Sequence, residues 1–140
     1  MRLVLLFWCQ SFFFKNKLCK GVEVLGSGTS GIIPEETPLA PVGAIQALLD
    51  QTKICLSKVA FIELMEAYAA QAIMCARFCN LDLDKINIRG GALSRGHPIG
   101  ASGAILVVRL FNELIKKPET FGMAAIAAAG GIGSAMMLKS

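Results

Sequence analysis

The sequence predicts an α/β fold in which a mixed sheet of about five strands is packed between α-helices and ends in an antiparallel hairpin. Three observations lead to this prediction. Short apolar runs rich in β-branched and aromatic residues alternate with longer segments of helical periodicity. The last two apolar runs are separated only by a glycine-rich turn. A content of 54% hydrophobic and 17% charged residues is typical of a packed domain and not of a disordered chain.

Residues 1–20 are an apolar N-terminal segment of open role. Residues 3–14 are mostly large and apolar, but Gln10 and Ser11 interrupt them, and the run is shorter than the ~20 residues that span a membrane. A signal peptide would need a small-residue cleavage site where this chain has Lys15–Leu18. Three interpretations stay open: a buried strand, a degraded signal, or sequence that became N-terminal when an upstream part was lost. The third is favoured, and a membrane anchor is the weakest alternative.

Residues 21–140 are expected to form one domain. Residues 21–25 predict a short strand, and the glycine and serine residues of 26–31 predict a loop after it. Pro41 is well placed to begin a helix that runs to about Gln51. Residues 59–64 predict a second strand.

The second half of the chain continues the alternation. An alanine-rich segment predicts a helix over 66–79, and the residues around Ile86 and Ile88 predict a strand ending at Gly90–Gly91. Apolar residues at three- and four-residue spacing predict an amphipathic helix over 101–116. Two closing strands, 121–126 and 135–138, flank the tight turn 130–133.

His97 is the only histidine of the chain and the first candidate for chemistry. It precedes the predicted helix 101–116, and a helix N-terminus disfavours an imidazolium and favours a neutral ring that can act as a base. A ligand carbonyl or anion would also be stabilised there. From spacing alone, a surface or hydrogen-bonding histidine remains the alternative.

The residues around His97 resemble a known signature. Gly90-Gly91-Ala92 followed by the string 96–104 (GHPIGASGA) is similar to the histidine-bearing motif of thiolases, the coenzyme A-dependent enzymes that form or cleave 3-ketoacyl thioesters. The resemblance extends from about Gly21 to the end and implies a thiolase-like C-terminal domain. It also implies that His97 is the catalytic histidine, which takes the proton from a nucleophilic thiol.

The same resemblance indicates a degenerate site. The family's Asn-Glu-Ala-Phe segment stands here as residues 65–68 (MEAY), so that Met65 replaces an asparagine that positions a water near the substrate. Ala127 stands where the family has its second catalytic cysteine. Ala129 replaces the first glycine of the closing glycine motif and is followed by Gly130. The resemblance implies that Met65, Ala129 and Gly130 border the substrate.

Together these expectations lead to one expected function and one alternative to it. The chain is expected to be a fragment of a thiolase-family acyltransferase, acting on or derived from acetyl-CoA and 3-ketoacyl-CoA chemistry and inactive alone, because the nucleophilic cysteine has no counterpart. The alternative is a non-catalytic truncated module, or a subunit half that pairs with another thiolase-like chain. A coenzyme A thioester would be the substrate, with no covalently bound cofactor.

The composition limits the kinds of ligand and partner that we expect this chain to bind. Scattered lysines and arginines and a net charge of +4 give no support for nucleic-acid binding. A single histidine and five cysteines without CxxC pairs predict no metal site and indicate reduced thiols in a cytoplasmic setting. The high apolar content favours a homo-oligomer or a thiolase-like partner chain.

Overall fold

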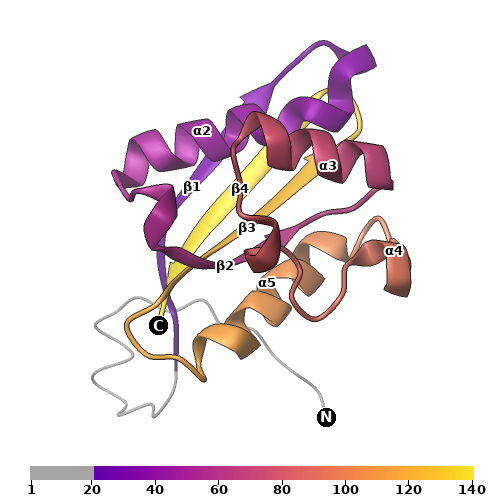
Figure 1. Cartoon of the computed structure of the whole chain (residues 1–140). Helices are drawn as coiled ribbons and strands as arrows, with labels where there is room; N and C mark the ends of the chain where they lie inside the picture. Colours follow the sequence, from indigo (N-terminus) through magenta and orange to yellow (C-terminus); the bar gives the residue numbers. More distant parts are fainter. Residues whose placement is uncertain (1–20) are drawn as a thin grey trace.

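A computed structural model describes residues 21–140, which fold around one mixed sheet of four strands (Figure 1). The spatial order is β1-β4-β3-β2, with bounds β1 Glu23–Gly31, β2 Val59–Leu64, β3 Phe121–Ala128 and β4 Ile132–Lys139. Strands β2 and β3 are parallel, while β4 is antiparallel to both β3 and β1. The predicted α/β class and the closing antiparallel hairpin are confirmed. The N-terminal segment 1–20 lies outside the described residues.

Helices cover both faces of the sheet. Helices α2 (Ala40–Thr52) and α3 (Ala69–Phe78) lie on one face, and α5 (Ser102–Leu114) lies on the other (Figure 1). Each face has its own apolar cluster. Ile45 and Leu48 of α2 pack with Met137 of β4, and on the other face Leu106 and Leu110 of α5 pack with Leu138 of β4. The short elements are η1 (Pro34–Leu39), η2 (Leu56–Lys58), η3 (Leu83–Lys85) and α4 (Ala92–Arg95). Within residues 21–140, no helix has the length and apolarity to cross a bilayer.

The glycine- and serine-rich segment 26–31 is part of β1, so the predicted loop there is wrong. The reason is the close approach of α2. A Cβ at Gly28 would lie 2.3 Å from the Ala44 carbonyl oxygen, and a Cβ at Gly133 would lie 2.1 Å from the Ala40 carbonyl oxygen. Glycine therefore lets the α2 backbone rest directly on the sheet. Tertiary packing, and not local preference, makes this segment a strand.

The alanine-rich helix begins later than predicted. Helix α3 starts at Ala69, not Glu66, because Tyr68 is extended with φ −161° and ψ 160°. Residues 65–68 instead form a loop that is held by side chains. The Ala67 N–H donates to Gln71 Oε1 at 3.1 Å, and Glu66 bonds to residues far along the chain.

The fifth strand that the sequence predicts around Ile86 and Ile88 is absent from the described residues, where the sheet has four strands. Ile86 forms only a single parallel bridge with Ile62. Asn87 then takes a left-handed conformation, with φ 48°, which ends the extended chain. Its side chain replaces the missing ladder: Oδ1 accepts from the Leu64 N–H at 2.9 Å and Nδ2 donates to the Leu64 carbonyl at 2.8 Å.

A buried ion pair fastens α5 to the same end of β2. Arg109 Nε donates to Glu63 Oε2 at 2.8 Å, and its Nη2 donates to the Gly90 carbonyl at 2.6 Å. Glu63 is 2% exposed. Burial raises the pKa of Glu63, although the Arg109 guanidinium opposes that shift. Removing either partner would leave an uncompensated buried charge, so the pair holds α5 in one position on β2.

Asn87→Ala should destabilise the domain strongly. The substitution leaves the buried N–H and C=O of Leu64 without partners, at about 1–3 kcal/mol for each group. Urea unfolding of both proteins measures the change in the free energy of unfolding. Asn112→Ala is the matched control, because Asn112 Nδ2 only donates to the Val108 carbonyl within α5. Equal losses for the two variants would contradict the role given to Asn87.

Candidate active site

The segments singled out in the sequence lie at one end of the parallel strand pair. Met65 directly follows β2, and Ala129 and Gly130 directly follow β3. Helix α5 returns the chain to the start of β3, so its N-terminus lies at this same end (Figure 1). Ligands of α/β proteins commonly bind at the carboxyl ends of parallel strands. This end of the sheet is therefore the candidate site.

His97 lies in the exposed turn that leads into α5. Its ring Nδ1 is 2.6 Å from Ser102 Oγ. Ser102 is 3% exposed, and its Oγ donates to the Pro98 carbonyl at 3.0 Å. The backbone N–H groups of Ala101 and Ser102 donate to the same carbonyl, at 2.8 and 2.9 Å. The turn thus holds the imidazole by one edge and leaves the other edge toward solvent.

Met65 lies beneath this turn and is not exposed to solvent. Its side chain is 3% exposed and packs with Ala92 and Leu106 in the α5 cluster. Its N–H donates to the Ala125 carbonyl at 2.9 Å, which extends the β2–β3 pairing by one residue. Neither its thioether nor its N–H is placed to bind a polar ligand.

The β3–β4 turn presents backbone groups at the surface. Ala129 and Gly130 are exposed, and Gly130 and Gly131 have φ of 86° and 80°. Gly131 is anchored, because its N–H donates to Thr37 Oγ1 at 2.8 Å and its carbonyl accepts from the Ile32 N–H at 2.8 Å. Within the described residues, no hydrogen bond uses the N–H of Ala129 or Gly130. Ala127, one residue inside β3, is half-buried.

Glu66 connects the loop after β2 to the histidine turn. Its Oε1 accepts from Asn87 Nδ2 at 2.6 Å, and its Oε2 accepts from the Leu93 N–H at 3.0 Å. Gly91 makes room for this carboxylate, since a Cβ there would lie 2.0 Å from its atoms. Among residues 21–140, no hydrogen bond joins His97 to Met65 or to the β3–β4 turn. The candidate site is therefore a set of residues at one end of the sheet that are not joined to His97 by direct hydrogen bonds.

The sequence missed the supporting residues Ser102, Glu66 and Asn87. Ser102 carried a usable signal, because it is the one hydroxyl in the otherwise apolar first turn of the helix and follows His97 closely. Asn87 carried none, since its partner Leu64 is 23 positions away in the chain.

Three cysteines lie in the described part of the chain. Burial raises the pKa of Cys75, and burial together with the neighbouring Cys75 raises the pKa of Cys79 to about 11. The Cys55 thiol is exposed, and hydrogen bonding from Ser57 lowers its pKa. Cys55 precedes β2, so six strand residues, about 20 Å, separate it from the Met65 end of the sheet. None of the three is placed to form a pair with His97.

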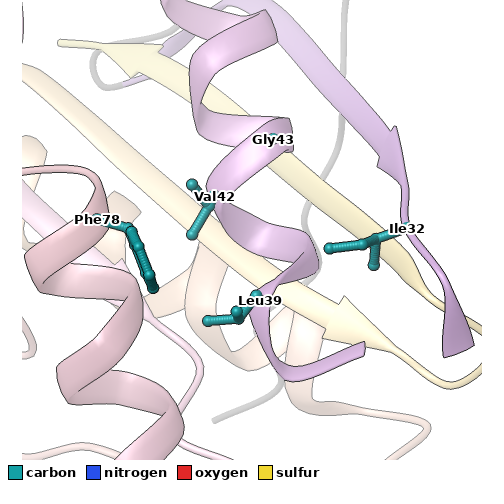
Figure 2. Close-up of a pocket in the computed structure, with 5 residues that line it drawn as sticks. All are labelled: Ile32, Leu39, Val42, Gly43 and Phe78. Atoms are coloured by element: carbon teal, nitrogen blue, oxygen red, sulfur yellow. The ribbon is translucent and has the colours of Figure 1, made fainter. Parts of the chain in front are cut away.

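A hollow on the α2–α3 face lies away from the histidine turn. It has a volume of about 210 Å³ and is lined by Ile32, Leu39, Val42, Gly43 and Phe78 (Figure 2). Its lining offers no polar side chain for chemistry. Residues 21–140 also contain no cluster of three or more His, Cys, Asp or Glu residues that could hold a metal ion.

Comparison with known families gives a match over almost the whole chain. The family model "Thiolase, C-terminal domain" matches residues 20–140. A protein of Bacillus subtilis (strain 168), provisionally named as an acetyl-CoA C-acetyltransferase, is 43% identical over 119 residues, which are 84% of this chain and 33% of that protein. A probable acetyl-CoA acyltransferase of Staphylococcus aureus (strain NCTC 8325) is 42% identical over 106 residues, 76% of this chain and 27% of its own.

Solved structures give the same family assignment. The Acat5 thiolase of Ascaris suum, crystallised in complex with coenzyme A, superposes with a TM-score of 0.89 at 33% identity, over 94% of this chain and 34% of that one. The acetyl-CoA acetyltransferase of Bacillus anthracis superposes with a TM-score of 0.88 at 29% identity, over 92% of this chain and 33% of its own.

This chain thus spans about a third of the length of the curated relatives it matches. The family match, the shared fold and the histidine turn at the N-terminus of α5 agree with one another. The chain belongs to the thiolase family, and its residues 20–140 correspond to the family's C-terminal domain.

Proposed function

We propose that this chain is a thiolase C-terminal domain that presents His97 as a proton acceptor toward a coenzyme A thioester site, and that it does not catalyse acyl transfer alone. The observation that carries the proposal is the contact between His97 Nδ1 and Ser102 Oγ at the N-terminus of α5. A partner of the same family would supply the nucleophilic thiol. The substrate class follows from the relatives, which are named for acetyl-CoA and one of which was crystallised with coenzyme A.

We infer the tautomer of His97 from the hydrogen bonds of Ser102. A serine hydroxyl has a single proton, and Ser102 donates it to the Pro98 carbonyl. Ser102 Oγ therefore accepts from His97, which places the ring proton on Nδ1. In the neutral ring, Nε2 then carries the free lone pair. Nε2 is the atom that would take a proton from an approaching thiol.

The three thiols of residues 21–140 do not provide the other half of this chemistry. A nucleophilic cysteine needs thiolate character and a position beside its base. Cys75 and Cys79 have raised pKa values, and Cys55 lies at the opposite end of β2. Ala127 offers no proton at the position where the resemblance places the family's second cysteine. These features support a domain that depends on a partner for its reaction.

The tautomer can be tested by ¹⁵N NMR, because His97 is the only histidine of the chain. The wild-type protein, with a neutral ring, should show a protonated Nδ1 and an unprotonated Nε2. Ser102→Ala should shift the population toward the Nε2–H form, since Nδ1 loses its acceptor. Ser94→Ala is the control, because Ser94 Oγ donates to the Gly91 carbonyl in the neighbouring turn. An Nε2–H ring in the wild type would contradict the assignment.

The thiols should differ in reactivity. Iodoacetamide at pH 7.5 should modify Cys55 much faster than Cys75 or Cys79, because a lowered pKa enriches the reactive thiolate and a raised pKa depletes it. As the pH rises toward 9, the thiolate fraction of Cys55 saturates first. Peptide mapping by mass spectrometry follows each site. Comparable rates for Cys55 and Cys79 in the native protein would contradict this order.

The function itself is tested with acetoacetyl-CoA cleavage. The chain alone should show no turnover above buffer. A chimera in which residues 21–140 replace the matching third of the Bacillus subtilis relative supplies the rest of the enzyme and should be weakly active. In that chimera, Ala127→Cys and Met65→Asn should raise the rate. The second change should have an effect on the order of 10²–10³ if it restores one oxyanion element.

Two variants of the chimera make this test specific. His97→Ala should abolish the remaining turnover, whereas Ala128→Cys, which places a thiol one residue from the proposed position, should not increase it. The proposal would be overturned by turnover of the chain alone at the rate of the intact relative. A chimera whose rate is unaffected by His97→Ala would equally remove the role of this residue.

A further inference from the structure

Helix α3 exposes its larger apolar side chains and buries a polar one. Ile73, Met74 and Phe78 are 49%, 38% and 61% exposed. They form one stripe along the helix, because residues four apart lie on the same side. On the buried side, Gln71 is 3% exposed, and its amide donates to Cys75 Sγ at 3.4 Å. This is the reverse of an ordinary surface helix, which buries its apolar stripe.

The composition of this stripe is typical of a protein interface. Aromatic residues, Met and Arg are enriched in interfaces, whereas Lys, Glu and Asp are depleted. The α3 stripe consists of Ile73, Met74, Arg77 and Phe78, and the helix contains no Lys, Glu or Asp. Within residues 21–140, no ion pair involves Arg77. The stripe therefore has the composition of a surface that another protein covers.

The apolar hollow between α2 and α3 adjoins the stripe. Figure 2 shows Phe78 on one side of the hollow and Ile32 on the other, with Leu39 and Val42 between them. Its volume is about 210 Å³. An apolar cavity of about 150 Å³ is large enough to hold a benzene ring. The hollow can therefore accept an aromatic side chain from a partner.

The two sides of the hollow carry opposite charges. On the side of Ile32, the exposed Glu35 and Glu36 lie in η1. On the side of Phe78, the exposed cation is Arg77. In the described part of the chain, neither glutamate forms an ion pair. A two-fold axis through the hollow would bring the acidic side of each copy onto the basic side of the other, so this surface is complementary to itself.

We propose that two copies of this chain associate through the α3 stripe and the hollow beside it, with the Phe78 side chain of each copy entering the hollow of the other. Self-complementary charge favours a second copy over an unrelated protein. The ten residues of α3 span about 15 Å, so the contact is small and belongs to the weak, reversible class. It lies on the opposite face of the sheet from α5 (Figure 1), so it does not depend on the proposed role of His97.

Sedimentation of the full chain over a range of concentrations tests the proposal, and it should show a reversible equilibrium between monomer and dimer. Phe78→Glu should raise the dissociation constant on the order of 30-fold or more, the effect of losing an aromatic residue at the centre of an interface. Ile99→Glu is the matched control, because Ile99 is also apolar, is 84% exposed, and lies in the histidine turn that leads into α5. It should leave the dissociation constant unchanged.

Charge reversal tests the orientation of the two copies. Arg77→Glu and Glu36→Arg should each raise the dissociation constant on the order of tenfold, because the two-fold axis repeats the lost pair twice. The double variant should return it close to the wild-type value, since each pair forms again with the signs exchanged. A surface that merely tolerates apolar contact would show no such rescue. Far-ultraviolet circular dichroism verifies that each variant is folded.

Four results would overturn the proposal. The first is a full chain that stays monomeric over the whole concentration range. The second is a dimer that Ile99→Glu dissociates and Phe78→Glu does not. The third is a double reversal that binds as weakly as the two single changes combined. The fourth is a monomeric chain that binds phosphatidylcholine vesicles and loses this binding with Phe78→Glu, which would assign the stripe to a lipid surface.

Discussion

The side-chain amide of Asn87 makes the contacts on which the candidate-site end of the domain depends. It bonds to both backbone groups of Leu64 as a further strand would, although the chain turns away at this residue. Its Nδ2 also contacts the Glu66 carboxylate, which in turn accepts from the Leu93 N–H. One buried amide therefore links the end of β2, the loop after it and the helical turn before His97. Such a network is rigid because every buried group in it has a partner.

Helix α5 connects this end of the sheet to the histidine turn. The Arg109–Glu63 pair fixes the helix on β2, and the Arg109 contact with the Gly90 carbonyl fixes the glycine turn above it. The N-terminus of the helix then determines where the histidine turn lies, and Ser102 determines how the imidazole is oriented. Orientation by a second residue is a general requirement for a histidine that acts as a base.

The hydrogen bonds and packing that hold the candidate site are thus retained, whereas some of the reactive side chains that the resemblance implies are replaced. Within residues 21–140, the buried side-chain polar atoms all have hydrogen-bond partners, and the domain superposes closely on about a third of each of the two solved chains. The positions aligned by the resemblance with the family's polar and sulfur groups carry Met65 and Ala127, which fit the packing but cannot transfer a proton. The residues that pack the fold differ from those that react, so the fold can be retained while the reactive side chains change.

The sequence by itself determined the elements with strong local signals. Apolar periodicity predicted α2, α5, β2 and the β3–β4 hairpin, and the string around His97 predicted both the family and a turn before a helix. Only the tertiary structure decided the rest. Segment 26–31 is a strand because α2 rests on Gly28, and the chain near Ile86 is a single bridge because Asn87 turns it away. These outcomes depend on partners distant in the chain, and local preference contains no information about them.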